Sequence, residues 1–323
     1  MTYNINITHD VSIILSTYKS DDYINDYFNN IVDLINVANI QLIHVINEAT
    51  DQELLCKNKF LNLQKIYGKK KFHYKYLVVP RESLYCSWNR AIKLSDSKFI
   101  TISNVDDIRY PDGLRRQISF LKKSKNISLV SGQCDEKNLY GLRERRTINN
   151  LSLNNSSFYS GMYIGPFFMW TNPKYFGQKD IYFDEQFLVA GDFDFQIRFS
   201  AIGNISILDD YIGQYLNIGK GLSTGSIYQI IEGQMIYSRY FVRDKIIPLF
   251  SYLFFKKTYF PKKFKLDNKL IPIEEICQNV ESIKDINSNR NLNFIGLFKS
   301  FFLLIKLIIK FFLIRKYFIK NNR

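Results

Sequence analysis

Histidine, cysteine, proline and glycine are all scarce in this chain of 323 residues, which contains 3, 4, 7 and 15 of them respectively. With three histidines, a site built on a histidine base or a histidine metal cage has few residues to draw on. The cysteines form no C-x-x-C pair, so the sequence predicts reduced structural thiols of a cytosolic protein. The low glycine and proline content argues against a linker-rich or repetitive architecture.

Long uninterrupted apolar runs are missing as well. The first apolar run, Val11–Leu15, has the length of a strand and follows no charged segment, so the sequence predicts no signal peptide. Hydrophobic residues still make up 46% of the chain and aromatic residues 16%, which is enough to bury a substantial core.

Strand-like and helix-like segments alternate through the first 130 residues. The predicted strands are 11–16, 41–46, 74–79, 99–103 and 128–131, and the predicted helices are 21–37, 51–67, 84–94 and 111–123. This order predicts a Rossmann-like α/β domain with a mostly parallel sheet and flanking helices, which binds ligands at the carboxyl ends of its strands. We expect this domain to span residues 1–243, with a helical, basic and aromatic region at 244–323.

Two adjacent carboxylates, Asp106 and Asp107, directly follow the predicted buried strand 99–103. Paired carboxylates in a ligand crevice are unfavourable unless a cation lies there, and Mg²⁺ or Mn²⁺ bridging phosphates would satisfy them. The alternative is that Asp107 or Asp112 caps the helix that begins near Pro111. The local sequence leaves both interpretations open.

A second acidic segment, Gly191–Arg198, begins another predicted helix. Asp192 near the helix N-terminus could take a proton from an attacking hydroxyl, or it could simply cap the helix. Ser16, Thr17 and Tyr18 after the first strand could hold a nucleotide base, although a strand-end turn explains them equally well. The segment 219–225 lacks the Walker spacing, and its Lys220 either covers a diphosphate or lies in a surface turn.

Taken in order, these segments resemble family-2 glycosyltransferases. Val11–Tyr18 is similar to the opening strand of that family, and Arg81–Ala91 to its third-helix segment with an Asn-x-Ala pair at Asn89. Lys98–Asp107 is similar to its D-x-D stretch, and Phe183–Arg198 to its acceptor-side "ED" motif. The resemblance covers roughly residues 10 to 225.

The resemblance implies a GT-A fold and an inverting, metal-dependent transfer from a nucleoside-diphosphate sugar, most readily a UDP-sugar. It implies that Asp192 is the catalytic base and that Asp106 binds Mg²⁺ or Mn²⁺, with Asp107 beside it as a second contact. The donor would be contacted by a set of strand-end and loop residues: Ser16, Thr17, Tyr18, Asn47, Glu48, Asn89, Asn104, Asp106 and Lys220.

The sequence departs from the family pattern at three places. The first acidic position of D-x-D is Asn104, the acidic pair after the second strand is Asn47-Glu48, and the glutamate of "ED" is Gly191, which makes Asp194 a rival base. These departures keep open a non-catalytic member that acts as a binding or scaffold protein in a membrane glycan-assembly complex. A nucleotidyltransferase is disfavoured because no Gly- and Arg/Lys-rich triphosphate loop follows the first strand.

The net charge of +14 is concentrated at the C-terminus. Residues 293–323 contain no acidic residue but seven basic ones: Lys299, Lys306, Lys310, Arg315, Lys316, Lys320 and Arg323. A helix over about 294–320 would be amphipathic, which predicts attachment to an anionic membrane surface rather than to nucleic acid. There are two alternatives. The helix could pack on the domain or on a second copy in a homo-oligomer, or it could span the membrane.

We therefore expect a cytoplasmic protein, peripheral on the inner face of the cell membrane, whose acceptor is a glycan or lipid-linked surface-glycan precursor.

Overall fold

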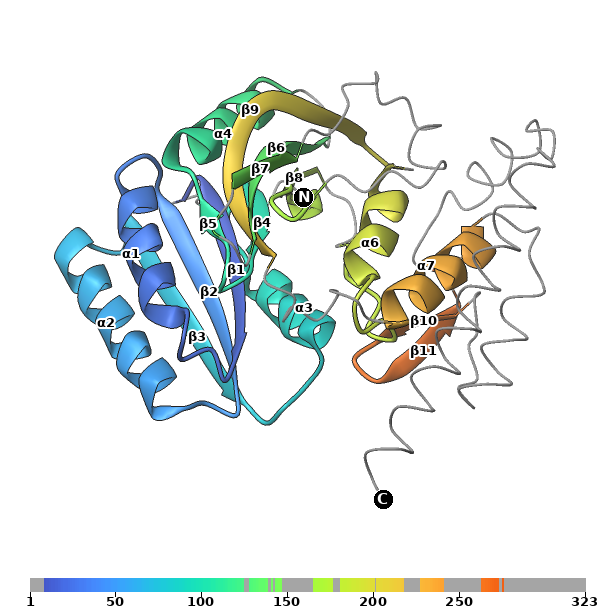
Figure 1. The fold of residues 1–323 in the computed structure, drawn as a ribbon, viewed down its shortest axis with the longest axis horizontal. Helices are drawn as coiled ribbons and strands as arrows, with labels where there is room; N and C mark the ends of the chain where they lie inside the picture. Colours follow the sequence, from blue (N-terminus) through green and yellow to red (C-terminus); the bar gives the residue numbers. More distant parts are fainter. Residues whose placement is uncertain are drawn as a thin grey trace. The chain divides into compact units, whose positions relative to one another are not determined.

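Figure 1 shows the computed structural model of the chain. The structure describes residues 9–124, 128–138, 141, 143–146, 165–176, 181–200, 202–217, 227–240, 263–272 and 275. Lys220 and the expected amphipathic helix at 294–320 lie outside these residues, so the predictions made for them stay predictions.

One large sheet organises the fold, with strand order β3-β2-β1-β4-β8-β6-β9-β5 and β7 paired to β6. Its strands are β1 (Val11–Tyr18), β2 (Ile40–Asn47), β3 (Phe72–Val79), β4 (Phe99–Ser103), β5 (Ile108–Arg109), β6 (Ser128–Asn138), β7 (Arg143–Arg146), β8 (Met169–Thr171) and β9 (Asn204–Asn217). β3, β2, β1 and β4 run parallel, as the alternating sequence pattern predicts. Beyond β4 the sheet is mixed, because β8 runs antiparallel to both β4 and β6.

Helices cover both faces of this sheet (Figure 1). They are α1 (Ile24–Ile35), α2 (Asp51–Tyr67), α3 (Leu84–Leu94), α4 (Pro111–Lys123), α6 (Gly191–Ser200) and α7 (Ile227–Tyr240), with a short 3₁₀ helix at Pro173–Phe176. The ends of two helices follow from local chemistry. Thr50 and Glu53 form a capping box at the start of α2, and Pro111 occupies the first turn of α4.

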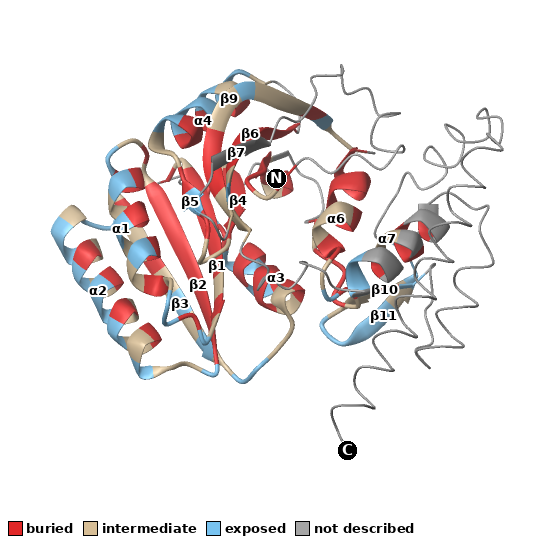
Figure 2. Ribbon diagram, in the orientation of Figure 1, coloured by how far each residue is buried: buried red, intermediate tan, exposed pale blue. Residues whose placement is uncertain are grey.

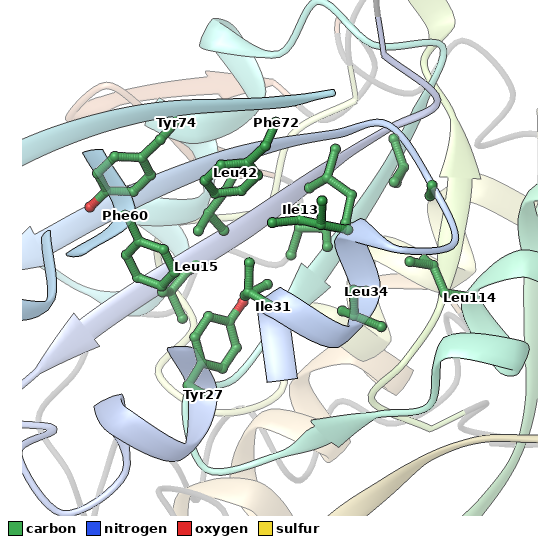
Figure 3. Close-up of a cluster of buried hydrophobic side chains, with 14 of the residues drawn as sticks. Ile13, Leu15, Tyr27, Ile31, Leu34, Leu42, Phe60, Phe72, Tyr74 and Leu114 are labelled. Atoms are coloured by element: carbon green, nitrogen blue, oxygen red, sulfur yellow. The ribbon is translucent and has the colours of Figure 1, made fainter. Parts of the chain in front are cut away.

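Two apolar cores lie on opposite faces of the sheet. The first joins β1–β3 to α1, α2 and α4; in Figure 3, Phe60 of α2 lies against Tyr74 of β3, with ring centroids 5.0 Å apart. The second joins the other face to α3 and α6 and is rich in stacked aromatic rings, such as Phe183 and Phe195 with centroids 4.4 Å apart. β1 and β2 are therefore buried on both faces (Figure 2).

A small hairpin, β10 (Lys263–Leu266) and β11 (Lys269–Pro272), follows in the region expected to be helical. Its turn residues Asp267 and Asn268 both have positive φ, as a two-residue hairpin turn requires. The hairpin belongs to the compact unit Met1–Ile283, and its Lys265 backbone amide donates to the Asp184 carboxylate. The unit Lys284–Arg323 is outside the described residues. Among the residues that the structure describes, no helix is long and apolar enough to cross a membrane.

Candidate functional site

Several of the candidate residues lie where parallel strands end. Tyr18 at the end of β1 pairs with Asn47 at the end of β2, and Leu15 of β1 pairs with Ser103 at the end of β4. Lys19 and Glu48, the residues that follow β1 and β2, have φ values of 49° and 45°. This left-handed conformation turns the chain sharply as it leaves each of these two strands.

The three residues at the end of β1 alternate between the two faces of the sheet. Thr17 is buried, and its hydroxyl bonds to His44 Nε2 at 2.9 Å, which places it in the core rather than at the edge. Tyr18 is partly exposed, and its hydroxyl accepts from Arg81 Nη1 at 2.6 Å. The Arg81 guanidinium also lies 4.1 Å from the Tyr18 ring centroid. Arg81 is thus a site residue that the sequence did not single out, although it lies two residues after the end of β3.

Asn47 is a buried connector between β1 and the start of α3. Its Nδ2 lies 3.2 Å from Ser16 Oγ and 3.1 Å from Ser87 Oγ, and its Oδ1 accepts from the Glu82 backbone amide at 3.2 Å. These bonds hold the end of β1 and the start of α3 in place at the carboxyl edge of the sheet. Glu48 beside it is exposed, so it is the member of the Asn47-Glu48 pair that faces solvent.

Asn89 also belongs to the interior, with 1% of its surface exposed. Its Nδ2 donates to the Phe183 carbonyl at 2.8 Å and to Glu185 Oε1 at 3.1 Å, while its Oδ1 accepts from the Phe183 backbone amide at 2.7 Å. Both ends of the amide therefore hold the segment before α6 against α3. The structure gives Asn89 this bracing role and does not bring it to the strand edge.

The turn after β4 separates its two carboxylates. Asp107 is buried, and it accepts from the Leu216 backbone amide and from Asn104 Nδ2, both at 3.0 Å. Burial, followed by the negative charge of Asp106, raises the pKa of Asp107 to about 7. Asp107 does not cap α4, whose N-cap residue is Tyr110; the Tyr110 side chain makes no capping bond, and its hydroxyl donates to Asp135 instead. Asp107 therefore ties the turn to β9.

Asp106 is the partly exposed member of this pair, and burial raises its pKa. Among the described residues, no three His, Cys, Asp or Glu side chains gather as a ready-made metal cage. A Mg²⁺ or Mn²⁺ ion held by one carboxylate and two substrate phosphates needs no such cage. A cation stabilises the charged form of two neighbouring carboxylates whose pKa values are raised. Asp106 could therefore bind such an ion, with the amide oxygen of Asn104 as a neutral ligand.

The first turn of α6 separates its two carboxylates in the same way. Asp194 is fully buried and forms ion pairs with Arg198 Nε at 2.8 Å and Arg239 Nη1 at 2.7 Å. Asp192 is partly exposed, and its Oδ1 accepts from the Phe193 backbone amide at 2.8 Å. Asp194 is committed to the fold, so Asp192 is the carboxylate of this helix that can meet a substrate.

Gly191 is required by the ring of Tyr85. A Cβ atom at residue 191 would lie 2.7 Å from two carbons of that ring, well inside van der Waals contact. The Tyr85 hydroxyl accepts from the Gly191 backbone amide at 2.8 Å. Because Tyr85 lies in the first turn of α3, this bond joins the start of α6 to the edge where β3 ends. The departure from the "ED" pattern thus has a local steric cause.

These features define an α/β protein with polar and acidic groups collected at the carboxyl edge of a parallel sheet. The sequence profile of glycosyl transferase family 2 matches residues 12–211, and the chain belongs to that family. Membership of this family leaves the nucleotidyltransferase alternative without support. No curated protein matches the chain.

Solved structures share this fold at low sequence identity. TarS 1-349 of S. aureus in complex with UDP-GlcNAc is 17% identical, with a TM-score of 0.52 over 76% of this chain and 73% of that one. The mannosyltransferase PcManGT from Pyrobaculum calidifontis, in complex with GDP-Man and Mn²⁺, is 12% identical, with a TM-score of 0.52 over 93% and 81%. TarS 1-349 in complex with UDP is 18% identical, with a TM-score of 0.49, and the chain covers 64% of it.

Proposed function

We propose that this chain transfers a sugar from a nucleoside-diphosphate donor, with a UDP-sugar the first choice, to a hydroxyl group with inversion at the anomeric carbon. One observation carries the proposal. The two carboxylates that the resemblance assigns to chemistry, Asp106 and Asp192, are the partly exposed members of their pairs, whereas Asp107 and Asp194 are buried.

In this proposal the donor lies along the strand edge, with its base near Tyr18 and Arg81 and its diphosphate near Asp106. Asp192 removes the proton of the acceptor hydroxyl as that oxygen bonds to the anomeric carbon. The bond from the anomeric carbon to the diphosphate breaks, and its electron pair leaves with the nucleoside diphosphate. A bound Mg²⁺ or Mn²⁺ ion would neutralise the charge of this leaving group.

A panel of UDP, GDP, CDP and their sugar conjugates, each with and without Mn²⁺, tests the donor site by thermal shift. A ligand at a hundred times its dissociation constant adds about 2.7 kcal/mol to stability. We expect one nucleotide to stabilise the protein only with Mn²⁺, and Asp106→Ala to abolish that effect. Asp112→Ala is the matched control, because Asp112 is exposed on α4 and pairs with Arg115. If no nucleotide stabilises the protein, the non-catalytic binding protein becomes the better interpretation.

We further propose that the acceptor is a glycan or lipid-linked surface-glycan precursor and that the protein acts at the inner face of the cell membrane. The support is the sequence of residues 294–320, where the spacing of Lys299, Lys306 and Lys310 among Phe, Leu and Ile would place the three lysines on one face if the segment formed a helix. Sedimentation with phosphatidylglycerol vesicles tests this step. Changing the three lysines to glutamate should abolish binding, and binding that survives this change would contradict the proposal.

A further inference from the structure

The segment immediately before Asp192 is held by side chains rather than by regular backbone bonds. Four consecutive backbone amides, from Leu188 to Gly191, donate to two residues of other helices. Glu232 of α7 accepts from Leu188 through Oε1 at 2.8 Å, and from Val189 and Ala190 through Oε2 at 2.9 Å each. The fourth amide, of Gly191, donates to the Tyr85 hydroxyl of α3 at 2.8 Å.

Both accepting side chains are shielded from water. Tyr85 is 1% exposed and Glu232 is 5% exposed. Hydrogen bonds from backbone amides to a carboxylate are strengthened by its charge, and buried amides that lose their acceptor are left unsatisfied at a substantial cost. The four bonds therefore select one conformation of the segment that leads into α6.

The two accepting residues are themselves fixed in place. The Tyr85 ring stacks on Phe183 with centroids 5.6 Å apart and meets Trp88 edge-on at 5.5 Å. On the other side, Arg239 near the end of α7 pairs with Asp184 and Asp194, both at 2.7 Å. The segment is thus held between two anchored helices and cannot shift without breaking buried bonds or ion pairs.

Asp192 lies directly after this held segment. Burial, followed by the negative charges of Asp192 and Glu232, raises the pKa of Tyr85 well above its ordinary value. Asp192 is also the residue after Gly191, whose backbone amide donates to the Tyr85 hydroxyl. A general base must sit within hydrogen-bond reach of its proton, and a displacement of about 1 Å can reduce the rate about a hundredfold.

We propose that Tyr85 and Glu232 form a clamp that positions Asp192 for proton removal, so that both are positioning residues for the transfer. This inference rests on the proposed function, because it assumes that Asp192 is the base. It adds a requirement that α3 and α7, which contribute no proposed catalytic group, set the geometry of that base.

Hydrogen exchange tests the clamp without any assay of activity. In Tyr85→Phe and Glu232→Gln proteins we expect faster exchange at the amides of residues 188–191, with the rest of α6 unchanged. Tyr74→Phe is the matched control, because Tyr74 is also a buried tyrosine with one hydroxyl bond, to His44 Nδ1 at 3.0 Å. Unchanged protection of residues 188–191 in both clamp variants would overturn the proposal.

Kinetics tests whether the clamp serves the base. The probes are UDP-GlcNAc and GDP-mannose with Mn²⁺, and the readout is release of the nucleoside diphosphate. We expect both clamp variants to lower kcat about tenfold or more while the KM for the donor stays within about twofold, because donor contacts are on other residues. The pH at which kcat falls on the acidic side should also shift, whereas Tyr74→Phe should change neither quantity.

The outcomes separate the two proposals. Faster exchange with unchanged kcat would make the clamp a purely structural feature and overturn its positioning role. If the wild-type protein releases nucleotide from no donor, the proposed function fails. The exchange measurement then still decides whether Tyr85 and Glu232 hold the segment before α6.

Discussion

Two regions of the molecule carry a pair of nearby carboxylates, and they use them differently. In the turn after β4, the buried Asp107 has neutral donors, the amide of Leu216 and Nδ2 of Asn104. In the first turn of α6, the buried Asp194 has two guanidinium partners, Arg198 and Arg239. In the first arrangement the pKa of the buried Asp107 is raised. In the second, two guanidinium groups balance the negative charge of the buried Asp194 carboxylate.

The difference shows how the two regions are built. The strand ends are shaped mainly by neutral hydrogen bonds, such as those of Asn47 and of the Thr17–His44 pair. The region around α6 is assembled from ion pairs that connect α6, α7 and the residues near 184. We therefore expect loss of a charge to reduce stability most in the region around α6. The strand-end region should instead make stability depend on pH, through the buried His44 and Asp107.

The largest effect should come from Asp194→Asn. This change removes the negative charge that pairs with the buried Arg198 and Arg239, of which Arg239 keeps its pair with Asp184. Breaking a buried pair from one side costs about 3–5 kcal/mol. Because total stability is commonly about 5–15 kcal/mol, much of it should be lost. Unfolding in urea, followed by circular dichroism, measures the change.

Asp192→Asn is the matched control for that variant, two residues away in the same helix. Its side chain is partly exposed, so we expect a stability change within about 1 kcal/mol. As the proposed base, it should instead lose about 10²- to 10⁴-fold in kcat while nucleotide binding is kept. Equal losses of stability in the two variants, or full activity of Asp192→Asn, would remove the distinction between the two carboxylates.

The sequence predicted the parallel half of the fold well, because each strand and helix there can be recognised from its own short stretch of sequence. Alternating apolar strands and helices gave β1 to β4 and α1 to α4 nearly at their observed bounds, with Pro111 marking the start of α4. In the mixed half, the sequence predicted the start of β6 but not the strand pairing, since β8 pairs antiparallel with β4 and β6 across long stretches of chain. No local pattern encodes such a pairing.

The sequence predicted where the candidate site lies in the fold better than it predicted which of its residues are exposed. The strand ends were identified because parallel strands place their carboxyl ends at one edge. Which of two neighbouring residues is buried could not be read from the sequence, because burial depends on distant partners: Leu216 for Asp107, Arg239 for Asp194 and Phe183 for Asn89. The clamp residues Tyr85 and Glu232 were missed for the same reason.

The smallest expected effect is on how stability depends on pH. It tests the contrast between the strand-end region and the charged region around α6. His44 is fully buried between Thr17 and Tyr74, and burial lowers its pKa from 6.5 to about 3. The unfolded chain binds a proton below pH 6.5 while the folded protein does not until about pH 3, so stability is lost as the pH falls through this window. Between pH 7 and pH 5 the loss from His44 alone should be about 2 kcal/mol. Asp107, whose pKa is raised to about 7, acts in the opposite direction over this range, so the difference in slope between wild type and a His44 variant isolates the contribution of His44.

Urea unfolding of wild-type and His44→Gln proteins at the two pH values measures this contribution. We expect the variant to be less stable at pH 7, because two buried hydrogen bonds are altered, but to lose less stability on going to pH 5. His73→Gln serves as the control, since His73 is partly exposed and should account for less of the slope. An unchanged slope in His44→Gln would contradict the contribution assigned to His44 and would leave Asp107 or the charged region around α6 as the source of the pH dependence.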